Sequence, residues 1–154
     1  MARSWKNPIL LDRWFEFLGL QHHASPNWYR SRIREELQER RTAKYLHQKI
    51  SETSDVLFSI HRACHDGIPC RQPPRKPHRC IPIYTYMLPK YTLRWKFFQI
   101  TAFLSGCPHY KNVREVVNPC KDENLRIVAQ RHDIDPERFA VTGRRLRNVW
   151  PLLP

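Results

Sequence analysis

Five prolines fall within fifteen residues near the middle of the chain, in the stretch IPCRQPPRKPHRCIP at 68–82. Proline has no backbone N–H and also restricts the residue before it, so clustered prolines disfavour helix interiors and central strands. The stretch therefore predicts an extended, partly polyproline loop between an N-terminal half at 7–67 and a C-terminal half at 83–154. It is also the most basic loop of the chain, with no acidic residue and the four cations Arg71, Arg75, Lys76 and Arg79.

Helix start and stop signals divide the rest of the chain. A capping residue precedes proline at Asn7-Pro8 and at Ser25-Pro26, which is a helix-start signal, and Asp66-Gly67 is a helix-end signal. No stretch alternates apolar and polar residues over the length of a strand. The sequence predicts one all-α domain over 1–154, an irregular bundle of about six to seven helices. The expected helices start near Pro8, Pro26 and Ser51 or Thr53, and then cover 90–104, 112–118, 121–132 and 136–150, with a short turn or helix at 84–88 that ends before Pro89.

Helical spacing also predicts which faces are buried. Leu10, Leu11, Trp14 and Leu18 form the expected docking face of the first helix. In the second helix Tyr29, Ile33 and Leu37 recur at i, i+4 and i+8, while the charged run from Glu35 to Arg41 is interpreted as a solvated face. The aromatic-rich stretch at 90–104 is too apolar for a surface helix, and we expect it to be central to the core.

The charge balance indicates the class of partner. Lys and Arg total 27 against 14 Asp and Glu, which gives a formal charge of +13 and a pI of about 10.0. Such a field favours anionic macromolecules, and nucleic acid or a ribonucleoprotein is the expected partner. A basic solvated surface without a specific partner is the alternative. The excess is concentrated at 61–100, where eight basic residues accompany Asp66 alone.

The cysteines do not suggest a disulfide scaffold. Their number is five, the N-terminal residues are not expected to form a signal peptide, and the chain is long enough to bury a core without covalent staples. The most apolar segment, FFQITAFLSG, is too short to span a bilayer. We therefore expect a soluble intracellular protein, and the sequence does not distinguish nucleus, cytoplasm and mitochondrion.

One group of residues has the side chains that zinc prefers. His61 and His65 are four residues apart on a predicted helix, and Cys64 lies beside them. The spacing does not match a standard zinc motif, and Cys64 also suits a buried apolar position. No GxSxG, GxxxxGK[ST], HExxH or GxGxxG motif is present. The sequence therefore predicts a non-enzymatic protein without a cofactor, and leaves a small metal protein or enzyme as an alternative.

The stretch LRIVAQRHDIDPERFAVTGRRL at 125–146 resembles the helix-turn-helix family. Ala129 stands at the close contact, Asp133 at the turn and Phe139 at the anchor of the second helix. The flanking positions of the pattern are filled by Leu125, Ile134, Asp135, Pro136 and Leu146. The resemblance implies DNA binding. However, the second helix begins with Pro136 and Glu137, and phosphates would repel that acid. A DNA contact is therefore expected at the far end of the helix, through Arg144, Arg145 and Arg147.

The stretches SETSDVLFSIHRACHDG, YTLRWKFF and RHDIDPERF, with RRLRNVWPLLP, resemble a group of uncharacterised small proteins of filamentous fungi. That resemblance implies no activity. A protein–protein interaction module remains a further alternative, with the Pro-rich loop at 68–82 or the tail at 150–154 as the ligand segment. The sequence does not fix the oligomeric state.

Overall fold

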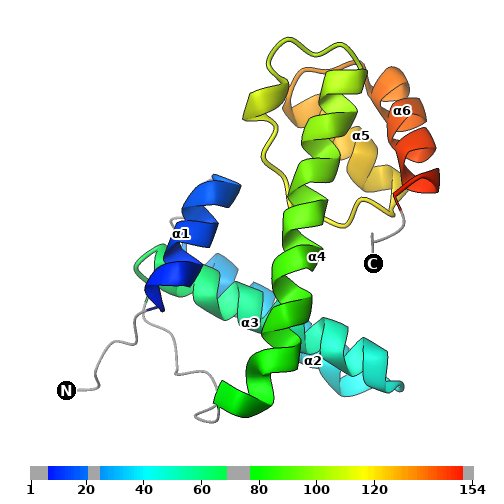
Figure 1. Ribbon diagram of the computed structural model, residues 1–154. Helices are drawn as coiled ribbons and strands as arrows, with labels where there is room; N and C mark the ends of the chain where they lie inside the picture. The colour runs from blue at the N-terminus through cyan, green and yellow to red at the C-terminus, as the bar shows by residue number, and fades with distance from the viewer. Residues whose placement is uncertain (1–6, 21–24, 69–76, 151–154) are drawn as a thin grey trace. The chain divides into compact units, whose positions relative to one another are not determined.

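The computed structural model describes residues 7–20, 25–68 and 77–150, and the side chains of 77–80 are not described within the last range. These residues are all-helical, with no strand among them (Figure 1). The fold class predicted from the sequence is confirmed. The helices are α1 (Ile9–Leu18), α2 (Pro26–Thr42), α3 (Leu46–His65), α4 (Pro77–Leu104), a 3-10 turn η1 (Tyr110–Asn112), α5 (Asp122–Arg131) and α6 (Pro136–Asn148).

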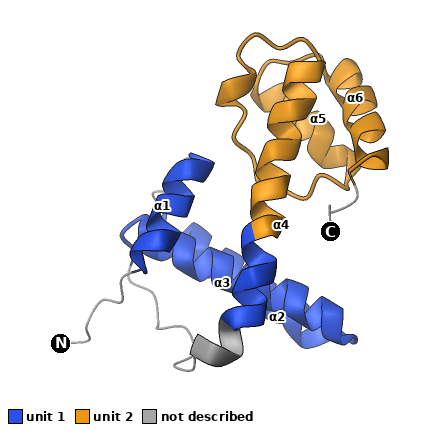
Figure 2. Ribbon diagram, in the orientation of Figure 1, with its two compact units in different colours: residues 1–88 blue, residues 89–154 orange. Residues whose placement is uncertain are grey.

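The chain divides into two compact units, Met1–Leu88 and Pro89–Pro154 (Figure 2). The first unit holds α1, α2, α3 and the beginning of α4, and the second holds the rest of α4 with η1, α5 and α6. No helix in the described part of the chain is long and apolar enough to cross a membrane.

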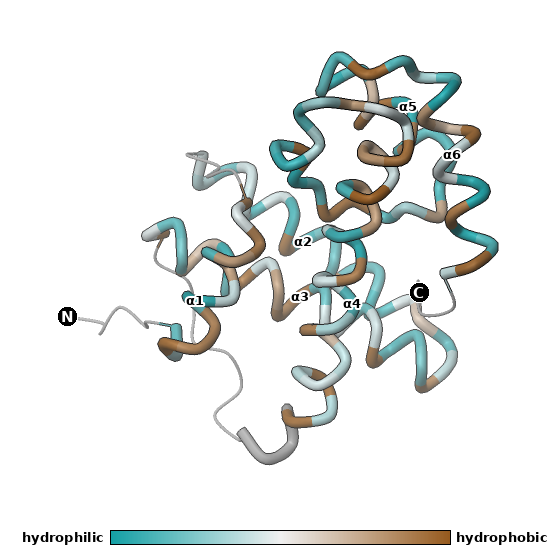
Figure 3. Tube along the Cα trace, turned by 45° about the horizontal axis from the view of Figure 1, so that its top comes forward, coloured by the Kyte–Doolittle hydropathy of each residue, from teal (hydrophilic) through white to brown (hydrophobic). Residues whose placement is uncertain are grey.

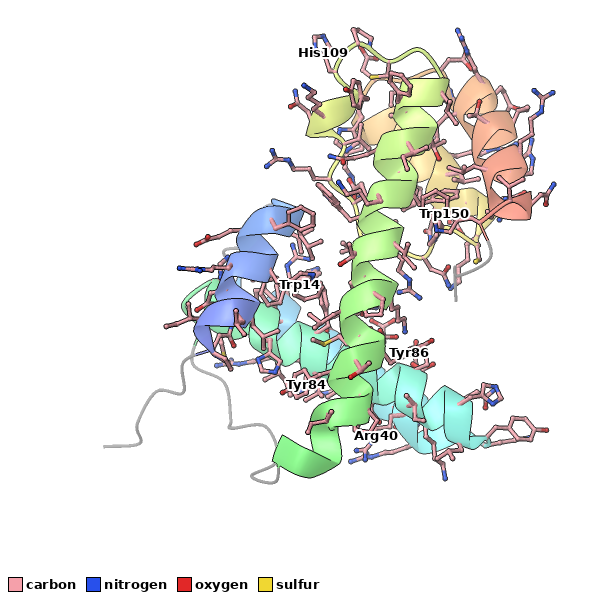
Figure 4. All side chains as sticks on the ribbon, in the orientation of Figure 1. Trp14, Arg40, Tyr84, Tyr86, His109 and Trp150 are labelled. Atoms are coloured by element: carbon pink, nitrogen blue, oxygen red, sulfur yellow. The ribbon has the colours of Figure 1, made fainter. Side chains whose placement is uncertain are left out.

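The first unit is built on the helical hairpin of α2 and α3, and α1 packs against α3. Phe15 of α1 is buried, with its ring centroid 5.5 Å from that of Phe58 in α3, and Trp14 meets the same ring edge-on at 6.0 Å. The labelled Trp14 lies between α1 and α3 in Figure 4. Leu10, expected in this face, is instead 79% exposed, because the buried stripe runs through Leu11, Phe15 and Leu18.

Helix α4 corrects the predicted loop at 68–82 and the predicted break before Pro89. Residues 77–82 are helical, and the helix continues without interruption through Pro82 and Pro89. Pro77 takes the first helical position, where the missing N–H costs nothing. Pro89 cannot donate the helical hydrogen bond to the carbonyl of Thr85, a defect that ordinarily costs about 3 kcal/mol. Burial of large side chains further along the helix, Phe97 and Phe98 among them, offsets that cost.

The second unit has a continuous apolar core. It is lined by α4, α5, α6 and the segment between them, and its fully buried members include Phe97, Phe98, Val113, Leu125, Val128 and Phe139. Figure 3 shows hydrophobic and hydrophilic residues alternating around the helices, as amphipathic helices require. The aromatic residues predicted to be central, those of the stretch at 90–104, are largely buried here.

The helix predicted at 112–118 is wrong. A 3-10 turn ends at Asn112, and the chain then runs irregularly through Val113 to Asn118. Valines favour extended backbone, and Glu115 finds its partners outside the segment. Its carboxylate accepts hydrogen bonds from Arg131 at 2.7 and 2.8 Å and lies 3.1 Å from His132 Nε2. These contacts with the end of α5 tie the irregular segment to the core.

The turn between α5 and α6 matches the predicted packing. Leu125, Ala129, Ile134, Phe139 and Leu146 are all buried. The Asp135 carboxylate caps α6 by accepting the Arg138 N–H at 2.6 Å, with Pro136 at the first position of the helix. Asp133 has a φ of 54°, the left-handed conformation that the missing glycine would have supplied.

Gly143 of α6 provides a sharp test of this packing. A Cβ added at Gly143 would lie 2.7 Å from Leu125 Cδ2, inside the fully buried contact between α5 and α6. Alanine would gain about 1 kcal/mol of helix propensity, but overpacking costs about 1–3 kcal/mol. We expect Gly143→Ala to lower the free energy of unfolding in urea denaturation, whereas the matched change Thr142→Ala, on the same helix, leaves it nearly unchanged. A Gly143→Ala protein more stable than the wild type would contradict this packing.

Candidate nucleic-acid interface

The turn between α2 and α3 carries a group of exposed cations. We call residues 40–49 the α2–α3 tip; it contains no Asp or Glu. Helix α2 ends at Thr42, whose hydroxyl donates to the Glu39 carbonyl at 3.0 Å. The Gln48 side chain accepts the N–H groups of Lys44 and Tyr45 at 3.2 and 3.3 Å, which orders the start of α3. The tip is therefore a tight, capped turn at the end of a helical hairpin (Figure 1).

The cations of the α2–α3 tip are exposed and unpaired within the described part of the chain. Arg40 and Arg41 lie in the last turn of α2, where the helix dipole favours positive charge. Lys44 follows in the turn, and Lys49 lies in the first turn of α3, which holds no acid. The labelled Arg40 projects from the hairpin in Figure 4. Four cations without counter-charges are free to meet an anionic ligand.

An aromatic pair accompanies these cations. Tyr45 is 62% exposed, and its ring stacks on that of His47 with centroids 5.8 Å apart and planes inclined by only 5°. Leu46 between them is 75% exposed. Tyr45 and Leu46 therefore provide exposed apolar surface next to the cations in the chain.

This group was not found from the sequence, which interpreted Glu35 to Arg41 as a uniform solvated face. That interpretation is wrong at Glu36, which is buried with 1% of its surface exposed. Glu36 lies three residues after Ile33 and seven after Tyr29, so it falls on the packed side of α2. Arg40 and Arg41 remain on the solvent side. The alternation of basic and aromatic residues in RRTAKYLHQK was the available signal.

The structure does not describe the side chains of the basic residues predicted to bind in the Pro-rich stretch. Arg71, Arg75 and Lys76 lie outside the described residues, and Arg79 is placed only as backbone in the first turn of α4. Their role in binding stays a prediction. The tail at 151–154 lies outside the described residues as well.

Two of the three predicted arginines of α6 have counter-ions. Arg147 donates to the Asp122 carboxylate and to the Cys120 carbonyl, and Arg144 reaches the same carboxylate at 3.5 Å. The hydrogen bond from Arg147, with the charges of both arginines, lowers the pKa of Asp122. These contacts join the two ends of the α5–α6 pair. Among the described residues only Arg145 of the three is exposed and forms no ion pair.

The candidate metal ligands of α3 are not brought together. The ligand atoms of His61, Cys64 and His65 do not lie within 4.8 Å of one another. His61 Nδ1 lies 2.9 Å from Asn7 Oδ1, and Nε2 lies 2.7 Å from the hydroxyl of Tyr84, labelled in Figure 4. Burial lowers the pKa of His61 to about 4, so the ring is neutral at pH 7. His61 acts as a buried hydrogen-bonding link between α3, α4 and Asn7.

His65 and Cys64 have separate surroundings. The His65 ring stacks on Phe15 with centroids 5.2 Å apart, and its Nδ1 lies 3.1 Å from Asp12 Oδ1. Cys64, Cys107 and Cys120 form no disulfide bond with one another. These contacts make His65 part of the packing of α1 against α3.

Comparison of the chain with protein-family models, with curated proteins and with solved structures finds no match.

Proposed function

We propose that this protein binds single-stranded nucleic acid, free or within a ribonucleoprotein, through the α2–α3 tip. One observation supports the proposal above the others. Arg40, Arg41, Lys44 and Lys49 are exposed and form no ion pair with the described residues, and in the chain they flank the stacked pair of Tyr45 and His47. The formal charge of +13 adds a long-range attraction for polyanions.

The two kinds of side chain match the two parts of a nucleotide. The guanidinium and ammonium groups neutralise phosphates and release condensed counterions, which supplies most of the affinity. An exposed aromatic ring offers a stacking surface to an unpaired base, worth about 1–3 kcal/mol per base. Bases inside a duplex are already stacked on both faces, so the Tyr45 ring favours a single strand.

The resemblance of 125–147 to the helix-turn-helix family supports a different contact, with duplex DNA. The ion pairs of Arg144 and Arg147 with Asp122 leave Arg145 as the cation best placed for it. Glu137 at the start of α6 pairs with Arg126 at 3.2 Å and keeps an acid where a reading helix meets bases. We therefore rank this contact second.

The binding experiment compares two matched pairs of substitutions in the full chain. Arg40→Gln with Arg41→Gln removes two charges from the α2–α3 tip, and Arg30→Gln with Arg34→Gln removes two exposed charges from the same helix, about 10–15 Å away. Fluorescence anisotropy with a labelled single-stranded oligonucleotide measures affinity against salt. We expect the tip pair to reduce the salt slope by about 1.4 and the control pair to reduce it less.

Tyr45→Ala isolates the stacking contribution. We expect it to weaken single-stranded binding by about 1–3 kcal/mol without changing the salt slope, because it removes no charge. Arg145→Gln should affect only duplex binding. The proposal would be contradicted if the Arg40/Arg41 variant, the Arg30/Arg34 variant and the Tyr45→Ala variant all bound the single-stranded oligonucleotide with the same affinity. The triple substitution of Arg71, Arg75 and Lys76 by Gln tests whether the Pro-rich segment contributes to nucleic-acid binding. Recovery of a protein partner after nuclease treatment tests the alternative that the chain is a protein–protein interaction module.

A further inference from the structure

Glu36 is an ionisable side chain in a buried position whose hydrogen bonding is incomplete. It is 1% exposed, on the face of α2 that packs against α3. Its Oε1 forms an ion pair with Nη2 of Arg32, which lies one helical turn earlier on α2, and the two atoms are 2.5 Å apart. Its Oε2 has no hydrogen-bond partner among the described residues. A buried carboxylate oxygen left in this state costs free energy, and requires an explanation.

Two further carboxylates lie beside it. Glu39 follows Glu36 by three residues on α2, and Glu52 reaches the same place from α3. One oxygen from each of the three side chains lies within 4.8 Å of the other two. The acidic residues come from both helices, so their mutual repulsion acts directly against the packing of the hairpin.

The surrounding charges relieve this repulsion only in part, because Arg32 lowers the pKa of Glu36 while burial and the neighbouring acids raise it. Arg32 is the cation facing Glu36, and 43% of its side chain is exposed to solvent. Asp55, buried on α3, adds a fourth negative charge to the field at Glu36. Burial, together with Asp55, Glu39 and Glu52, raises the pKa of Glu36 to about 7. A proton on Glu36 or a cation bound to it would compensate the remaining negative charge of this carboxylate.

The oxygen positions suit a cation. A hard divalent ion binds carboxylate oxygens at about 2.0–2.6 Å, so oxygens of one shell lie no more than about 5 Å apart. Three oxygens within 4.8 Å of one another satisfy that limit. The set contains oxygen ligands only, which selects magnesium, calcium or manganese over zinc or copper. Glu39 is exposed, so water can complete the coordination.

We propose that Glu36, Glu39 and Glu52 bind one hard divalent cation that joins α2 to α3. The buried Oε2 of Glu36 supplies the inner ligand, and the cation replaces the missing hydrogen bond. Arg32 stays on the other oxygen of the same carboxylate. The site stands independently of nucleic-acid binding, since it uses none of the side chains assigned to that role.

The test titrates the full chain with Mg²⁺, Ca²⁺ and Mn²⁺ by isothermal calorimetry at pH 8, and with Mn²⁺ by electron paramagnetic resonance. We expect one ion per chain. Glu36→Gln and Glu39→Gln should each weaken binding by at least about tenfold, which is 1.4 kcal/mol. The matched control is Glu35→Gln, because Glu35 is a neighbouring, exposed acid that also pairs with Arg32, at 2.9 Å.

Each outcome decides the proposal. Circular dichroism confirms that the three variants are folded before titration. Stoichiometric binding that Glu35→Gln retains and the other two lose supports the site. Absence of stoichiometric binding of all three ions to the wild-type protein overturns it, and so does equal weakening by all three substitutions. Nucleic-acid affinity measured in EDTA tests the α2–α3 tip separately.

Discussion

Phe139→Ala is expected to cost about 3–5 kcal/mol of the free energy of unfolding, the largest effect of a single substitution in the second unit. Phe139 is fully buried at the centre of the core that joins α4, α5 and α6. Its ring stacks parallel to Phe98, with centroids 6.5 Å apart and planes inclined by 6°. Alanine would leave a cavity against Phe98 that the surrounding helices can only partly fill.

Urea denaturation followed by circular dichroism measures this loss, and hydrogen exchange of the α5 and α6 amides locates it. A small domain has about 5–15 kcal/mol in total, so local unfolding of both helices is the expected consequence. Val141→Ala is the matched control, because Val141 is 39% exposed on the same helix. A loss below about 1 kcal/mol for Phe139→Ala would show that the core is not built around this ring.

Glu36→Gln is expected to stabilise the first unit at pH 8 in EDTA, by about 2 kcal/mol. The folded protein raises the pKa of Glu36 from 4.5 to about 7. Between these pH values the folded form keeps a proton that the unfolded chain has released, so stability falls as pH rises through that window. The penalty above pH 7 is about 3 kcal/mol. Glutamine removes it and loses the half-exposed Arg32 pair, worth about 1 kcal/mol or less.

The pH dependence provides the control. At pH 4, below both pKa values, Glu36 is largely protonated in both states, so the wild type and Glu36→Gln should have nearly equal stability. Burial lowers the pKa of His61 to about 4, so protonation of the unfolded chain removes stability as pH falls from about 6.5 to 4. That loss is common to both proteins and cancels in their difference. A variant that is less stable than the wild type at pH 8 would contradict the assigned cost.

Much of the α5–α6 pair was predictable because its signals are local. Asp135-Pro136 marks a helix start through capping and a fixed φ. Leu125, Ala129 and Phe139 fall at spacings that fit the packing of a helix-turn-helix pair, and all three are buried. The chemistry expected at its far end was less predictable. The sequence predicted that Arg144 and Arg147 contact DNA. In the folded protein both contact the carboxylate of Asp122, which is more than twenty residues away in the chain.

The candidate interface at the α2–α3 tip was also not predictable from the sequence, because the sequence does not show which cations remain without an ion pair after folding. RRTAKYLHQK is basic and aromatic in the sequence, but so are other stretches of the chain. Whether a cation is available depends on which acids fold next to it. The cations of the α2–α3 tip form no ion pair among the described residues, whereas at Asp122 and Glu115 the acids and cations neutralise one another.

The sequence by itself determined the all-helical class, the starts of α1, α2 and α6, the end of α3 before Asp66-Gly67 and the basic charge, because periodicity, capping and composition act within a few residues. Tertiary structure alone decided that α4 continues through Pro82 and Pro89, and that 112–118 is irregular. It also decided that Glu36 is buried beside two other acids. Each of these depends on burial energy or charge supplied by distant segments, which outweighs a local preference of a few kcal/mol.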